Sequence, residues 1–169
     1  MKSRLFKLMG IEPGEESMIS LLLTQSVFLG IFLGAFDISA HSFFLSIFDE
    51  KMMARGYVLS GMACIILTSL YTWMQAKIKF SKFSTVNLAF ISTITLILWI
   101  LLLTNPDKWV IWHVFIMLGP LNILAILGFW GTVSRLFTLR QGKRLFGLID
   151  AGLIIGIILS SYAIPLLLT

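Results

Sequence analysis

The chain has 169 residues, of which 58% are hydrophobic and only 12% are charged. A soluble domain is about 45–50% apolar and about 25% charged, so this composition excludes an ordinary soluble protein. The formal net charge is +5. The cations are spread over short segments between long apolar runs, which argues against a nucleic-acid partner and for the lipid bilayer as the surroundings of the chain.

The apolar runs predict an all-α integral membrane protein with five transmembrane helices. A helix needs about 20 apolar residues to cross a bilayer, and runs such as ITLILWILLL are apolar on every face. Nothing alternates with the period of two that a β-barrel strand would require. We expect a transmembrane domain over residues 15–169, with helices at about 18–48, 57–76, 85–103, 109–134 and 145–168.

Residues 1–14 are expected to form an amphipathic segment on the cytoplasmic membrane surface. Residues 2–9, KSRLFKLM, interleave three cations with apolar side chains, which suits a short helix on an anionic leaflet. Pro13 and Gly14 end that segment, and Glu15 and Glu16 favour the start of the next helix through its dipole. The apolar stretch that follows is far longer than the 7–15 residues of a signal-peptide core.

The distribution of Lys and Arg predicts the orientation. One side of the membrane receives ten of these residues: Lys2, Arg4, Lys7, Lys77, Lys79, Lys82, Arg135, Arg140, Lys143 and Arg144. The other side receives three: Lys51, Arg55 and Lys108. The positive-inside rule therefore predicts a multi-pass protein of the inner (plasma) membrane with a cytoplasmic N-terminus. The chain ends directly after an apolar run, so we expect a fragment that continues into a sixth helix.

The most specific pattern lies between Phe129 and Gly156. In order it contains Phe129-Trp130, Phe137, Gln141, Lys143-Arg144, Phe146-Gly147, Ala151-Gly152 and Gly156. This pattern resembles the region between the fourth and fifth helices of the ATP/ADP translocase (nucleotide transporter) family and its bacterial relatives in the major facilitator superfamily. The stretches IEPGEE and FFLSIF near the N-terminus are similar to the opening of those relatives.

The resemblance implies a partial major-facilitator-type half, a six-helix bundle that lacks its last helix. It also implies the N-terminal part of a secondary transporter that works by alternating access on a nucleotide or another small organic anion. The missing half would come from further sequence or from a second membrane subunit. Residues 36–41 lack the fixed cations that nucleotide exchangers carry late in the first span, so the substrate stays unnamed.

The alternative function is a non-transporting membrane anchor or scaffold subunit that assembles with partner membrane proteins. No HExxH, GxSxG or P-loop motif occurs, and the single cysteine, Cys64, lies in an apolar run. We therefore expect no enzymatic activity, no metal site and no cofactor.

Asp37 and His41 are the sharpest candidates for substrate binding or proton coupling. They are four residues apart and share one face of the first helix. An ionisable group inside the membrane costs about 2.5–3.5 kcal/mol at the helix centre and usually faces a cavity or a partner. The alternative is a pair near the outer interface that only stabilises the helix end. Asn122, just after Gly119-Pro120 in the fourth span, is a third candidate, for cavity lining or for packing at a proline kink.

Two further groups complete the candidates. Asp150 is expected to form an interface salt bridge, or a gate, with the loop cations Arg140, Lys143 and Arg144. Together with Arg135, those cations fit the positive-inside rule, and they could also draw an anionic substrate to a cytoplasmic mouth. The glycines four apart are expected to pack helices closely: Gly30 and Gly34 in the first span, and Gly152 and Gly156 in the fifth.

Overall fold

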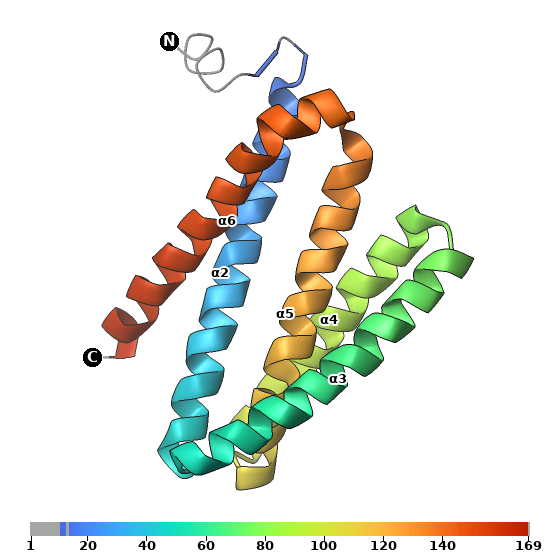
Figure 1. The fold of residues 1–169 in the computed structure, drawn as a ribbon. Helices are drawn as coiled ribbons and strands as arrows, with labels where there is room; N and C mark the ends of the chain where they lie inside the picture. The colour runs from blue at the N-terminus through green and yellow to red at the C-terminus, as the bar shows by residue number, and fades with distance from the viewer. Residues whose placement is uncertain (1–10, 13, 169) are drawn as a thin grey trace. The chain divides into compact units, whose positions relative to one another are not determined.

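Figure 1 shows the computed structural model, which describes residues 11, 12 and 14–168. These residues form five helices and no strand: α2 (Glu16–Ile47), α3 (Glu50–Lys77), α4 (Phe80–Thr104), α5 (Lys108–Leu136) and α6 (Leu139–Leu168). All five are long and apolar enough to cross a membrane. The prediction of an all-α, five-span, multi-pass membrane protein is confirmed. The amphipathic segment expected at residues 2–9 lies outside the described residues.

Three helices begin earlier than the sequence predicted. The α3 helix begins at Glu50 rather than near 57, α4 at Phe80 rather than 85, and α6 at Leu139 rather than 145. An apolar run marks only the part of a helix that suits hydrocarbon. The helix itself continues through polar residues, because each added residue gains a backbone hydrogen bond once the helix has nucleated. The described connections between the helices consequently shrink to two or three residues.

The chain divides into two compact units. Unit 1 contains the residues up to Ala35 and those from Gly131 onward, and unit 2 contains Phe36–Trp130. Both α2 and α5 are continuous helices that contribute residues to each unit.

In unit 1, the first part of α2 packs against α6 through four glycines (Figure 1). A Cβ atom on Gly30 would overlap the carbonyl oxygen of Leu153 and lie 3.0 Å from the Cα atom of Gly156. A Cβ atom on Gly156 would lie 2.9 Å from the Cα atom of Gly30. Similarly, Gly34 faces the Ser160 hydroxyl and Gly152 faces the Ser26 hydroxyl. The two backbones therefore meet with almost nothing between them, as small residues four apart allow in membrane helices.

In unit 2, aromatic rings from α2 and α5 form the core. The ring centroids of Phe44 and Phe115 are 4.2 Å apart, and both side chains are fully buried. The Trp112 ring also contacts the rings of Phe44 and Phe48. On α3, Gly56 admits the Phe115 ring, since a Cβ there would lie 2.7 Å from two ring carbons. Such offset ring pairs add about 0.5–1.5 kcal/mol each beyond the burial of their area.

A buried amide joins α4 to α5 within unit 2. The Asn87 side-chain nitrogen donates a hydrogen bond of 3.0 Å to the Leu124 carbonyl oxygen. Gly128 leaves room for that amide, because a Cβ on Gly128 would lie 2.5 Å from the same nitrogen. A polar group inside the membrane must find a partner within the protein, so this hydrogen bond fixes how the two helices pack.

Candidate functional site

The structure brings Asp37, His41 and Tyr57 together in unit 2. The Nδ1 atom of His41 lies 2.8 Å from the Asp37 carbonyl oxygen and 3.6 Å from its carboxylate oxygen Oδ1. The Nε2 atom of His41 lies 2.6 Å from the Tyr57 hydroxyl. Asp37 and His41 come from α2, and Tyr57 comes from α3. The sequence predicts the first two residues as candidates and marks Tyr57 only as an expected helix start.

The hydrogen-bond partners of His41 decide which ring nitrogen holds its proton. A carbonyl oxygen can only accept, so Nδ1 must donate to the Asp37 carbonyl. In the neutral ring, Nε2 then accepts the hydrogen bond from the Tyr57 hydroxyl. A second proton on Nε2 would require the Tyr57 hydroxyl to turn and accept. The nearby Asp37 carboxylate would balance the imidazolium charge that results.

The His41 ring also packs against an aromatic wall. The Phe115 ring meets it edge-on with centroids 5.3 Å apart, and the Tyr57 ring lies at 6.1 Å. The Asp37 side chain is 54% exposed, whereas that of His41 is 27% exposed. An exposed carboxylate on a membrane helix faces an aqueous cavity or a partner rather than lipid. The pair thus has one apolar side and one open side.

Asn122 does not join this group. It shares no hydrogen bond with Asp37 or His41 among the described residues, and its buried side-chain oxygen has no hydrogen-bond partner there. It follows Pro120, which is fully buried inside α5. Pro120 leaves one backbone carbonyl of α5 without its usual N–H donor. The Asn122 side-chain oxygen can only accept hydrogen bonds, so this atom does not bond that carbonyl.

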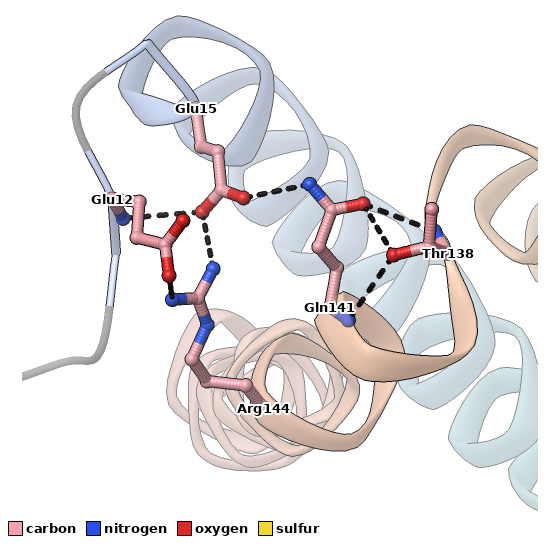
Figure 2. Close-up of polar contacts among 5 residues, drawn as sticks. All are labelled: Glu12, Glu15, Thr138, Gln141 and Arg144. Carbon is pink, nitrogen blue, oxygen red and sulfur yellow. Dashed lines mark hydrogen bonds and ion pairs between the residues drawn. The ribbon is translucent and has the colours of Figure 1, made fainter.

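In unit 1, a second polar cluster joins the start of α2 to the start of α6 (Figure 2). The Arg144 guanidinium binds Glu12 through Nη1 at 2.5 Å and Glu15 through Nη2 at 2.6 Å. The Gln141 amide nitrogen donates to the other oxygen of Glu15 at 2.8 Å. The pKa of Glu15 is lowered from its ordinary value of 4.5, chiefly because the backbone N–H of Glu12 donates to its carboxylate. Gln141 and Arg144 lower the pKa of this carboxyl further.

This cluster corrects the expected partners of Arg144. Asp150 forms no salt bridge within the described part of the chain, and Arg144 binds Glu12 and Glu15 instead. Arg144 and Asp150 are six residues apart on α6, about 240° around the helix, so they point to different sides. Lys143 is about 10 Å along the axis from Asp150 at 1.5 Å per residue, which exceeds the reach of an ion pair.

A capping box begins α6, and it explains the early start of this helix, which the apolar run alone did not predict. The Thr138 backbone N–H donates to the Gln141 side-chain oxygen at 3.0 Å, and the Gln141 N–H donates to the Thr138 hydroxyl at 3.4 Å. The pattern Thr138-x-x-Gln141 is the sequence signature of such a helix start. A cavity of about 470 Å³ beside it is lined by Glu12, Thr138, Arg140, Gln141 and Arg144.

No family model, no curated protein and no solved structure matches this chain. Among the described residues, no three His, Cys, Asp or Glu side chains lie close enough together to hold a metal ion.

Proposed function

We propose that this chain is the N-terminal part of a secondary membrane transporter that works by alternating access. The proposal draws on the resemblance of Phe129–Gly156 to the ATP/ADP translocase family and on five helices of span length. The observation that supports it most is the hydrogen-bonded group Asp37–His41–Tyr57 on membrane helices. Ionisable residues in such places commonly mark substrate or proton pathways.

In the proposed mechanism His41 holds the transported or coupling proton at Nε2. The neutral ring accepts from Tyr57, and the protonated ring donates to the Tyr57 oxygen. The carboxylate oxygen Oδ1 of Asp37 lies 3.6 Å from the Nδ1 atom of the same ring. Protonation of His41 adds one positive charge that offsets the Asp37 carboxylate, so the pair no longer repels a nucleotide or another organic anion. The chain itself performs no chemistry on that substrate in this proposal.

Alternating access requires a second half that rocks against this one. Further sequence or a second membrane subunit supplies it, and the proposal places the N-terminus in the cytoplasm of a cell with an inner membrane. The scaffold alternative depended on glycine faces free to bind other proteins. Gly30, Gly34, Gly152 and Gly156 contact each other's helices within unit 1, so they give that alternative no support.

The test is uptake into proteoliposomes by the purified protein that contains this chain at its natural length. Asp37→Asn and His41→Ala are each expected to abolish uptake of labelled nucleotides or organic anions, with expression and gel-filtration profile unchanged. Asp49→Asn and His113→Ala are the matched controls. Asp49 lies in the α2–α3 connection, and the hydrogen bond that the described residues give His113 goes to the Trp109 carbonyl of its own helix. Uptake that survives both test variants would refute the role of the pair.

A further inference from the structure

A narrow apolar crevice opens on unit 2, where the last turns of α3 face the first turns of α4. The two helices run side by side and antiparallel, joined by a short connection (Figure 1). The crevice has a volume of about 100 Å³ and is lined by nine side chains. Leu70, Met74, Val86 and Phe90 are among them, with Leu124 of α5 at the base. Its size and lining suit a stretch of hydrocarbon chain.

The few polar groups in the crevice offer little to a polar ligand. The Asn87 side chain is only 6% exposed, and its amide nitrogen is already bonded to the Leu124 carbonyl. Val86 and Phe90 are 48% and 41% exposed, so their apolar surface forms the open lip. A ligand in this crevice is therefore held by apolar contact, which favours the binding of an acyl chain over that of a free ion.

Three exposed lysines border one end of the crevice. The three are Lys77, Lys79 and Lys82, which lie in and beside the α3–α4 connection. Lys77 follows Met74 by three residues and Lys82 directly precedes Phe83, and both Met74 and Phe83 line the crevice. No Asp or Glu occurs between Arg55 and Asp107, and no described salt bridge involves these lysines. The Lys77 ammonium is held 4.0 Å from the centre of the Trp73 ring, which is typical of the membrane interface.

The spacing between lysines and crevice matches a phospholipid. From Lys82 to Phe90 the helix rises about 12 Å at 1.5 Å per residue, which lies within one leaflet of a roughly 30 Å core. We propose that this place is a binding site for an anionic phospholipid. Its phosphate lies against Lys77, Lys79 and Lys82, and one acyl chain lies between α3 and α4. The site is independent of the Asp37–His41 group and of the transport proposal.

The test measures lipid selectivity on the purified full-length protein. After delipidation in detergent, the protein is exposed to equal amounts of phosphatidylglycerol and phosphatidylcholine, and the bound ratio is read by mass spectrometry. Brominated phosphatidylglycerol should quench the protein fluorescence more than brominated phosphatidylcholine, and Trp73→Phe should remove that difference. Replacing Lys77, Lys79 and Lys82 by Gln should lower the preference by about fivefold per lysine at low salt.

Two matched controls separate a site from general attraction. The triple variant Lys51→Gln, Arg55→Gln and Lys108→Gln removes the same charge elsewhere and should keep the preference. Val86→Trp should fill the crevice and lower phosphatidylglycerol binding, whereas Leu96→Trp, at a residue of α4 with 54% exposure outside the crevice, should not. Both positions are half exposed, so neither change disturbs the core.

Three results would overturn the proposal. The first is an unchanged preference in the lysine variant, and the second is an equal loss in the two triple variants. The third is competition by inorganic phosphate as strong as that of the lipid, because it would assign the lysines to a free anion.

Discussion

Arg144 of α6 binds Glu15, which directly precedes α2, with an Nη2–Oε2 distance of 2.6 Å across 129 residues of sequence. The side chain of Glu15 is 14% exposed and that of Arg144 is 29% exposed, so this ion pair is less open to water than an ordinary surface pair. Glu12, at 68% exposure, completes the contact from the outside. The relationship ties the starts of the two helices that meet through the glycines.

Loss of the Arg144 guanidinium should weaken unit 1. Arg144→Gln removes two charge-assisted hydrogen bonds and leaves Glu15 partly buried without its cation, so we expect a stability loss of about 1–3 kcal/mol. Chemical unfolding in detergent, followed by circular dichroism, measures it. Lys143→Gln is the control, since Lys143 is exposed and adjacent. A double-mutant cycle with Glu15→Gln should give a coupling energy clearly different from zero, and additivity would contradict the pairing.

The same carboxylate predicts an acid dependence of stability. The folded pKa of Glu15 lies below its ordinary value of 4.5, so the folded state favours the charged form. Its contribution should be complete above about pH 4.5, and it should be lost as the pH falls below that value through the lowered folded pKa. The midpoint of unfolding measured across this range should fall less steeply in Glu15→Gln than in the parent. Identical pH profiles for the two proteins would contradict the lowered pKa.

Adding bulk at the α2–α6 contact should separate the helices. Gly156→Ala places a Cβ 2.8 Å from the Ile31 nitrogen and 2.9 Å from the Gly30 Cα, both backbone atoms that cannot turn aside. Overpacking of this kind costs about 1–3 kcal/mol. Gly147→Ala in the same helix is the control, because a Cβ there meets nothing within 4 Å. Thermal unfolding should show a loss for the first variant only, and equal melting temperatures would refute the contact.

The tautomer of His41 is open to direct measurement. Its Nδ1 atom and that of His113 both bond a carbonyl oxygen four residues earlier, at 2.8 and 2.7 Å. Both neutral rings should therefore carry the proton on Nδ1, the less common tautomer in water. Nitrogen-15 NMR of labelled histidine should show this for both residues. In Tyr57→Phe only the Nε2 signal of His41 should shift, and an Nε2–H form in the parent would disprove the arrangement.

Hydropathy alone determined the architecture of this chain. Five apolar runs, each long enough for a bilayer, left one solution, because a backbone in hydrocarbon must satisfy its own hydrogen bonds as a helix. This reasoning did not predict that three of the helices begin at Glu50, Phe80 and Leu139. Hydropathy does not indicate whether polar residues at a membrane surface are helical. The capping box at Thr138 would have predicted the third start.

The sequence by itself also placed Asp37 and His41 on one face, since a spacing of four is fixed by the helix. Only the tertiary structure supplied Tyr57 as the partner of His41 and Glu15 as the partner of Arg144. Periodicity describes one helix at a time, and these contacts join different helices. Which helices approach depends on small residues such as Gly30 and Gly156 meeting each other, and that choice becomes visible only when both backbones are in place.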